Sequence, residues 1–218
     1  MIWAVVLAAG ESRRMGTQKL LLPFGETTVV GAVVRAALAS RAGRTLVVLG
    51  ADRVAVQEEM ETLSHVSESV DAWPLRKIEF AVNENYPLGM LSSIQAGFKA
   101  LPTDADAAVV MLGDQPFLPA KVVDAVIEAY RTSGKGIVIP VFRGRRGHPV
   151  LVDMRYRDEV LELDPADGLR RLMRTHPGDI HEVDVDDANI LRDMDTPEDY
   201  RAAPDGVRST FYPKTCKR

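Results

Sequence analysis

The fold is decided by the stretch IWAVVLAAGESRRMGTQK, residues 2–19. Its first part, 2–8, is a continuous apolar run, which is typical of a β-strand buried on both faces of a parallel sheet. The run leads into a segment that contains two glycines, two arginines and a lysine. Glycine lets backbone amides approach a ligand closely, and the cationic side chains add positive charge. The stretch therefore predicts a buried strand followed by a loop with the chemistry to hold polyphosphate.

Outward from this stretch, apolar runs of strand length alternate with helical patterns. Further strands are expected at 45–49, 77–82, 107–112, 137–142, 149–152 and 180–185. Helices are expected at 28–40, 52–63, 90–101, 121–132, 167–175 and 197–203, and a loop at 64–74. Such alternation with short loops implies a mainly parallel sheet with helices on both faces. We therefore expect an α/β, Rossmann-like doubly wound fold, in which ligands bind beyond the carboxyl ends of the strands.

Length and composition limit the class of protein. A chain of 218 residues suits one α/β domain, which we place at 1–203, followed by a basic, loosely held tail at 204–218. The formal net charge of −4 argues against a nucleic-acid partner, which usually needs a basic face. The single cysteine, Cys216, excludes an internal disulfide and fits a reducing, cytoplasmic compartment. The apolar start is too short for a membrane span and lacks the basic residues of a signal peptide, so no membrane partner is expected.

The spacing of the glycines excludes two common phosphate-binding loops. A Walker A loop needs a lysine directly after its second glycine, but here Thr17 and Gln18 separate Gly16 from Lys19. The dinucleotide fingerprint G-x-G-x-x-G is also absent. Taken alone, a loop rich in glycine and arginine can equally be a surface turn whose charges are solvated.

The full pattern is more specific than its glycines. LAAG-x-S-x-RMG-x-x-K, at 7–19, resembles the signature of the sugar-nucleotide-transferase-like nucleotidyltransferases, and among them that of the molybdenum cofactor cytidylyltransferases. Four later segments match in order: NENYPLGMLSSIQAG (83–97), MLGDQPFLP (111–119), GRRGHPVLV (144–152) and RDMDTPEDY (192–200). The resemblance covers nearly the whole chain to about Tyr200.

The resemblance implies a nucleotide site around the opening loop. It assigns the nucleotide-binding backbone to Leu7, Ala8, Ala9 and Gly10, and the phosphate contacts to Ser12, Arg14 and Lys19. Arg14 and Lys19 are the expected catalytic cations, since they would stabilise charge that develops in the transition state. The segment 83–97 is expected to contribute Asn83, Gly89, Ser92 and Ser93 to nucleotide recognition. Ordinary helix capping is the simpler interpretation of Ser92 alone.

Three aspartates are the candidate metal ligands. Asp114 follows a predicted buried strand, and Mg²⁺ usually takes one or two carboxylates together with phosphate oxygens and water. Asp193 and Asp195 lie two residues apart, so in an extended segment they share one face. Turn and helix-capping roles remain open for Asp114 and Asp195, and Asp199 is expected to be structural.

The remaining motif, GRRGHPVLV, is assigned to the second substrate. We expect Arg146, Gly147 and His148 to bind the phosphate and the polar pterin of the acceptor, although a histidine in a loop is often only a structural hydrogen-bonding group. The resemblance then implies Mg²⁺-dependent transfer of CMP from CTP to the terminal phosphate of molybdenum cofactor, with release of pyrophosphate. It links LAAG, with Ala9, to cytidylyl rather than guanylyl transfer.

Other functions remain open at this point. One alternative is a nucleotidyltransferase that uses GTP, or a different phosphorylated acceptor such as a sugar or polyol phosphate. A second alternative is a non-catalytic carrier that delivers the cofactor to a molybdenum hydroxylase. Under the enzyme hypothesis, a molybdenum hydroxylase is equally a possible partner, as the protein that receives the product. Candidate metal ligands at Asp114 and Asp195 favour the enzyme, since a carrier has no use for a metal site.

Overall fold

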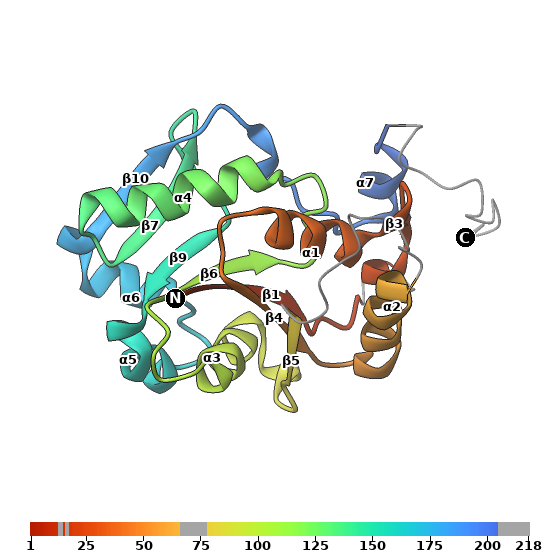
Figure 1. Ribbon diagram of the computed structural model, residues 1–218, viewed down its shortest axis with the longest axis horizontal. Coiled ribbons are helices and arrows are strands. Elements are labelled where there is room, and N and C mark those ends of the chain that lie inside the picture. Colours follow the sequence, from red (N-terminus) through yellow and green to blue (C-terminus); the bar gives the residue numbers. More distant parts are fainter. Residues whose placement is uncertain (13–14, 16–17, 66–77, 205–218) are drawn as a thin grey trace.

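The structure is a computed structural model that describes residues 1–12, 15, 18–65 and 78–204 (Figure 1). Arg14, most of the loop predicted at 64–74 and nearly all of the tail predicted at 204–218 lie outside the described residues. The assignment of 1–203 to one domain stays a prediction. In the part of the chain that is described, no helix is both long enough and apolar enough to cross a membrane.

A mainly parallel sheet forms the centre of the molecule. Its strands are β1 (Ile2–Ala8), β4 (Arg44–Leu49), β5 (Ile78–Val82), β6 (Ala107–Leu112), β7 (Ile137–Phe142), β8 (Arg145–Arg146), β9 (Val150–Asp153) and β10 (Ile180–Asp184). They lie in the order β10-β7-β9-β6-β1-β4-β5, with β8 paired to β7. Among the described strands of this sheet, the antiparallel pairings are those of β9 with β6 and β7 and of β8 with β7. The predicted α/β fold with a mainly parallel sheet is confirmed.

The strand register brings several loops to one edge of the sheet. Leu7 of β1 pairs with Leu112 of β6, and Ala8 of β1 pairs with Leu49 of β4. The carboxyl ends of these strands are therefore level. Because β9 runs in the opposite direction, it is its beginning, near Val150, that reaches the same edge. Loops after β1 and β6 and the loop before β9 thus meet there, as expected for a ligand site in this class of fold.

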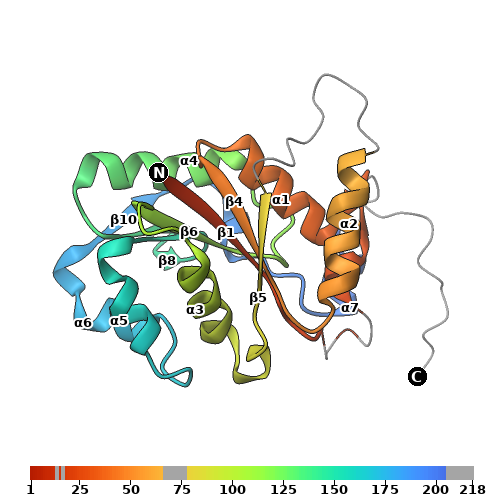
Figure 2. The same ribbon diagram turned by 60° about the horizontal axis from the view of Figure 1, so that its bottom comes forward.

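Helices cover both faces of the sheet (Figure 2). One face carries α3 (Met90–Ala100), α5 (Arg157–Glu162) and α6 (Arg170–Thr175). The other carries α1 (Val29–Ala39), α2 (Arg53–His65), α4 (Ala120–Ser133) and α7 (Pro197–Arg201). Alternate residues of β1 point to opposite faces, so Val6 packs in one core cluster and Val5 in the other. This explains why the sequence of β1 is continuously apolar.

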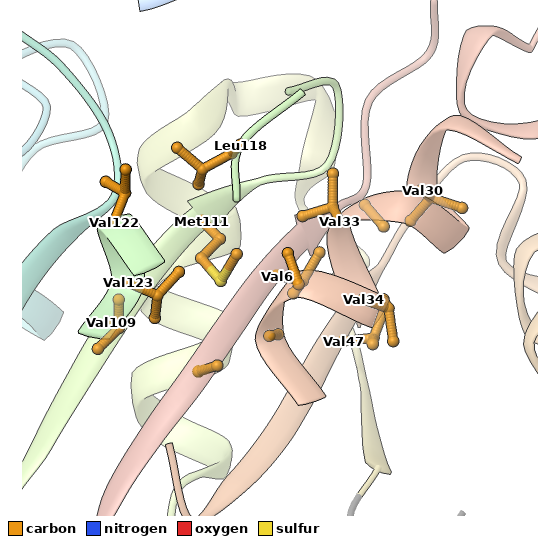
Figure 3. Packing of buried hydrophobic residues seen from close by; sticks show 14 of the residues in the cluster. Val6, Val30, Val33, Val34, Val47, Val109, Met111, Leu118, Val122 and Val123 are labelled. Carbon is orange, nitrogen blue, oxygen red and sulfur yellow. The ribbon is translucent and has the colours of Figure 1, made fainter. Parts of the chain in front are cut away.

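The valines of α1 and α4 make close contact with the sheet (Figure 3). Val33 and Val123 are fully buried and pack with Val6 of β1 and Met111 of β6. Each such side chain contributes roughly 1.5–3 kcal/mol when it is removed from water. On the other face, α3 approaches the sheet closely at Gly97, where a Cβ would lie 2.8 Å from Cγ1 of Val5. These contacts fix the helices whose ends border the functional edge.

Three local features differ from the sequence-based expectation. A short hairpin of β2 (Pro23–Phe24) and β3 (Thr27–Thr28) separates the opening loop from α1. The helix α5 was not expected, and at its end Nε2 of Gln95 on α3 donates to the carbonyls of Val160, Leu161 and the C-cap Leu163 at 2.9–3.2 Å. The helix predicted at 167–175 begins at Arg170, because Gly168 has a φ of 64° and ends a turn there. Long-range contacts and turn geometry decide these details.

Candidate active site

A cavity of about 320 Å³ lies at the carboxyl edge of the sheet, and we call it the first cavity. Its walls come from the loops after β1 and β6, the start of α3 and the segment before α7. The lining residues are Leu7, Ala9, Gly10, Lys19, Leu20, Tyr86, Gly89, Met90, Ser93, Leu112, Gly113, Asp114, Asp193 and Asp195. It therefore brings together one cationic and three anionic side chains from three segments that are distant in the sequence.

Lys19 is the centre of this charged group. Its Nζ donates to Oδ2 of Asp114 at 2.6 Å and to Oδ1 of Asp195 at 2.7 Å. The Lys19 side chain is only 12% exposed. Burial alone would lower the pKa of Lys19, but the charges and hydrogen bonds of Asp114 and Asp195 outweigh it, so the pKa is raised above 10.5. The lysine thus remains an ammonium at neutral pH and can face an anion.

The backbone that carries Lys19 is held by Ser12. The Ser12 hydroxyl donates to Oε1 of Gln18 at 2.6 Å and accepts from the backbone N–H of Lys19 at 3.1 Å. Gln18 in turn donates through Nε2 to Asp52 at the start of α2. Ser12 has a φ of 52°, a left-handed conformation that is uncommon for a residue with a side chain. Ser12 therefore shapes the loop, and it also lines a cavity next to the first one.

The three aspartates lie on two different backbone segments, one after β6 and one before α7. Asp114 follows β6, and its carbonyl accepts from the N–H of Met194 at 2.9 Å. Met194 is 1% exposed, and the carboxylates of Asp193 and Asp195 on either side of it both border the first cavity. Alternate residues of this extended segment thus share one face, as the sequence predicts.

Asp193 has a buried partner. Its Oδ1 accepts from Nε2 of Gln115 at 2.7 Å, and Gln115 is only 1% exposed. Burial raises the pKa of Asp193, the hydrogen bond from Gln115 opposes this shift, and the charges of Asp114 and Asp195 add to it. The site therefore concentrates negative charge that only a cation can balance.

The residues that cap α7 are Thr196 and Asp199, the neighbours of Asp195, and not Asp195 itself. Thr196 is the N-cap of α7, and its hydroxyl accepts from the N–H of Asp199 at 3.2 Å. The Asp199 carboxylate accepts in return from the N–H of Thr196 at 2.7 Å, which completes a capping box. Asp199 is therefore structural, and the Asp195 carboxylate contacts Lys19.

The aspartates fit a divalent cation by the chemistry of their donors. Among the described residues, no three His, Cys, Asp or Glu side chains gather closely enough to hold an ion by themselves. However, Asp114 and Asp195 already converge on one cationic atom at 2.6 and 2.7 Å. Mg²⁺ commonly takes one or two carboxylates and completes its octahedron with phosphate oxygens and water. The residues present fit such an ion when a triphosphate shares it.

The predicted residues of 83–93 separate into two groups. Gly89, with a φ of 101°, and Ser93 line the first cavity. Asn83 is 4% exposed and donates through Nδ2 to the hydroxyls of Ser92 and Ser93 at 2.9 and 3.0 Å. Its Oδ1 accepts from the N–H of Asn85 at 2.9 Å. Asn83 and Ser92 therefore hold the loop in place, while Gly89 and Ser93 border the open space.

The residues at the end of β1 are similarly divided. Leu7, Ala9 and Gly10 line the first cavity, whereas Ala8 packs in the core. Ala9 is 3% exposed, and a Cβ at Gly50 would lie 2.6 Å from the Ala9 methyl group. Glycine at position 50 thus makes room for Ala9.

A second, larger cavity of about 900 Å³ adjoins the first, and Met90 lines both. The predicted acceptor residues Arg146, Gly147 and His148 lie in its wall. Arg146 is paired with Glu182, since its Nε lies 2.6 Å from Oε1. Burial lowers the pKa of His148 to about 4, against the opposing charge of Asp114, so the imidazole is neutral at neutral pH.

Sequence reasoning missed part of both cavities. Tyr86 and Met90 border the first cavity, and both lie inside the segment 83–97, which could have signalled them. The second cavity includes residues 165–170, Met173 and Arg174, which belong to none of the matched segments. Arg14, the other predicted catalytic cation, lies outside the described residues.

Comparison with known proteins identifies the family of the chain. Residues 4–181 match the sequence profile of the MobA-like NTP transferase domain. The chain belongs to this family. As a MobA-like NTP transferase it acts on a nucleoside triphosphate and a phosphorylated acceptor, and enzymes of this kind typically use a divalent metal.

Relatives of known name are similar over almost their whole length. The chain is 26% identical to the molybdenum cofactor cytidylyltransferase of Escherichia coli, over 91% of this chain and 93% of that one. It is 30% identical to the purine catabolism protein PucB of Bacillus subtilis, over 90% and 92%. It is 29% identical to the nicotine blue oxidoreductase of Paenarthrobacter nicotinovorans, over 90% and 93%. The names of these relatives are therefore mixed.

Solved structures resemble the fold closely. The crystal structure of Rv0371c from Mycobacterium tuberculosis superposes with a TM-score of 0.74 at 28% identity, over 92% of this chain and 95% of that one. A crystal structure of the same mycobacterial protein in complex with manganese gives a TM-score of 0.70 at 26% identity, over 92% and 96%. The fold is thus shared over most of this chain.

Proposed function

We propose that the protein transfers CMP from CTP to the terminal phosphate of molybdenum cofactor, with Mg²⁺ as its metal. The observation that carries this proposal is the convergence of Lys19, Asp114 and Asp195 at the carboxyl edge of the sheet. These groups lie in the first cavity, and Met90 connects it to a second cavity large enough for another substrate. Nucleotidyl transfer needs this arrangement, because two substrates must meet at one cationic centre.

In the proposed reaction, a phosphate oxygen of the acceptor attacks the α-phosphorus of CTP. A new P–O bond forms, the bond to the β-phosphate breaks, and pyrophosphate leaves with its electron pair. The nucleophile is already an anionic oxygen, so the enzyme needs no general base to activate it. A bound Mg²⁺ would neutralise charge on the phosphates.

The protein's own groups hold and orient the substrates. The Lys19 ammonium would contact the triphosphate beside the backbone of Ala9 and Gly10, both in the wall of the first cavity. Asp114 and Asp195, with Asp193 beside them, would hold the metal, and Gln115 fixes the Asp193 carboxylate. Loss of one such preorganised charge costs about 10²–10³ in rate in comparable sites.

The choice of CTP rests on the LAAG segment and on the named relative from Escherichia coli. A direct steric role for the Ala9 methyl group has limited scope, since the residue is 3% exposed and lies against Gly50. Residue 9 would therefore affect the base through the position of the backbone at Gly10. The choice of acceptor is supported by the same resemblance and the same named relative. It is also supported by the size of the second cavity, about 900 Å³, which leaves room for a second substrate.

The test is pyrophosphate release with Mg²⁺ and molybdenum cofactor, with CTP, GTP, ATP and UTP compared at equal concentration. The proposal predicts turnover with CTP and at most a small fraction of that rate with the others. Turnover with GTP instead would contradict the base assignment and leave the chemistry standing. Turnover only with sugar or polyol phosphates as acceptors would contradict the acceptor assignment. Bound cofactor with no turnover for any nucleotide would favour a carrier.

A further inference from the structure

The two cavities differ in the sign of the charges that line them. The first cavity has one lysine and three aspartates in its walls, so it needs a cation as well as a polyanion. The second has three arginines, Arg146, Arg170 and Arg174, and one acidic residue, Asp167. An anionic group can therefore bind in the second cavity without a metal ion.

The arginines lie at different places along the second cavity. Arg146 comes from β8, close to His148, and its guanidinium is occupied by Glu182. Arg170 and Arg174 lie one helical turn apart on α6, so their side chains share one face of that helix. Residues of α6 line the second cavity and not the first, whereas Met90 lines both cavities. The α6 pair thus borders the region of the second cavity where a part of the acceptor outside the reaction centre would bind.

The charges of the α6 pair are largely available to a ligand. The side chain of Arg170 is exposed and has no hydrogen bond or ion pair with any of the described residues. Arg174 approaches Oδ1 of Asp167 only at 3.4 Å, longer than a good N–H···O hydrogen bond. Arginine presents its donors in a planar fork that suits oxyanions.

Around these arginines the wall of the second cavity is mainly apolar. Met90, Ile139, Val150 and Met173 are among its lining residues. Methionine side chains adapt to flat, polarizable groups and make favourable contacts with aromatic rings. The cavity therefore combines an apolar surface for a ring system with a cationic pair on α6.

We propose that Arg170 and Arg174 bind a second anionic group of the acceptor, on the side remote from the phosphate that attacks CTP. The acceptor class is then an organic phosphate with an apolar or aromatic body and a further oxyanionic end. A simple sugar or polyol monophosphate lacks that second anion and would bind less tightly. This inference deepens the proposed function and rests on the second cavity being the acceptor site.

The first test measures binding without any reaction. Two fluorescent probes share an apolar body: anilinonaphthalene sulfonate carries one anion, and N-phenylnaphthylamine is neutral. We expect the double variant Arg170→Gln/Arg174→Gln to bind the sulfonate about tenfold more weakly, the effect of one lost charge-assisted hydrogen bond. Its affinity for the neutral probe should stay within about twofold of wild type, because the apolar wall is unchanged.

Arg171→Gln is the matched control, since Arg171 is an exposed arginine on the same helix and is not in the wall of the cavity. It should leave the affinities for both probes unchanged. The inference is overturned if the double variant and the control show the same sulfonate affinity. It is also overturned if the neutral probe loses affinity to the same degree as the sulfonate.

The second test uses turnover with CTP and molybdenum cofactor. The double variant should raise the KM for the cofactor about tenfold and keep kcat and the KM for CTP within about twofold, the pattern of lost binding that is equal in the ground state and the transition state. An unchanged KM for the cofactor would overturn the inference while the proposed function stands. Absence of turnover in the wild type would instead contradict the proposed function, and the probe experiment would still decide the role of the arginines.

Discussion

Replacement of Lys19 by methionine should tighten the binding of a divalent metal in the absence of nucleotide. The Lys19 ammonium occupies Oδ2 of Asp114 and Oδ1 of Asp195 at 2.6 and 2.7 Å. These are oxygens that a metal ion would use, so the ammonium and the metal compete. Methionine keeps most of the length and apolar volume of lysine but removes the competing charge.

The size of the effect follows from the two ion pairs. A hydrogen bond to a charged group contributes about 1.5–3 kcal/mol. The Lys19 side chain is 12% exposed, but the Asp114 and Asp195 side chains are 20% and 34% exposed, so water weakens the second pair in particular. We therefore count one bond rather than two. Loss of about 1.5–3 kcal/mol of competition corresponds to roughly 10–100-fold tighter metal binding.

Titration with Mn²⁺, followed by the loss of the free-ion paramagnetic resonance signal, measures this affinity directly. Lys121→Met is a suitable control, because Lys121 is 72% exposed and its ion pair with Asp187, at 3.5 Å, lies away from the first cavity. It should not change metal binding. The turnover rate of the Lys19 variant should at the same time fall about 10²–10³-fold, since the cation that faces the triphosphate is gone. Equal or weaker Mn²⁺ binding by the Lys19 variant would refute competition at these oxygens.

Three further predictions concern stability and the nucleotide loop. Gly50→Ala places a Cβ 2.6 Å from the Ala9 methyl group, so it should lower the free energy of unfolding by about 1–3 kcal/mol and weaken CTP binding. Thermal melts and nucleotide titrations measure these two effects. The control Gly178→Ala has open space around the new Cβ and should show neither effect. Asp193→Asn should raise the melting temperature at neutral pH, because the raised pKa of Asp193 means that its charged form destabilises the fold. This gain in melting temperature should vanish as the pH falls toward 3.8, where the wild-type carboxyl is also protonated. A variant that melts at a lower temperature than wild type at neutral pH would contradict this. His148→Gln should reduce the loss of stability between pH 6.5 and about 4, since the lowered pKa of His148 makes the wild-type fold bind fewer protons than the unfolded chain there; parallel melting curves across this range would count against it.

The sequence predicted the central strands best. β1 at Ile2–Ala8, β6 at Ala107–Leu112 and β7 at Ile137–Phe142 have the predicted bounds. Each is a continuous apolar run that is buried along most of its length, so a local pattern is enough to define it. The direction of β9 could not be predicted in this way, because nothing in its four residues distinguishes an antiparallel from a parallel partner.

The site was predictable where its chemistry depends on residue type and position in a motif. The aspartates at 114, 193 and 195 line the first cavity, together with Lys19. The structural roles of Asn83 and Ser12 were not predictable, because both depend on hydrogen bonds to residues whose placement only the fold decides. The same reason applies to α6, whose arginines reach the second cavity through the path of the chain after α5.

The most direct test of the central claim follows the α-phosphorus itself. Wild-type protein is incubated with Mg²⁺, molybdenum cofactor and CTP that is radiolabelled at the α-phosphate, and the label is traced by chromatography. The proposed function predicts that label moves into a cytosine dinucleotide of the cofactor in equal amount to the pyrophosphate released, and that Asp114→Asn abolishes this transfer while keeping the wild-type melting temperature within a few degrees. Label that remains in CTP, or an Asp114→Asn variant that transfers it at the wild-type rate, would contradict the claim.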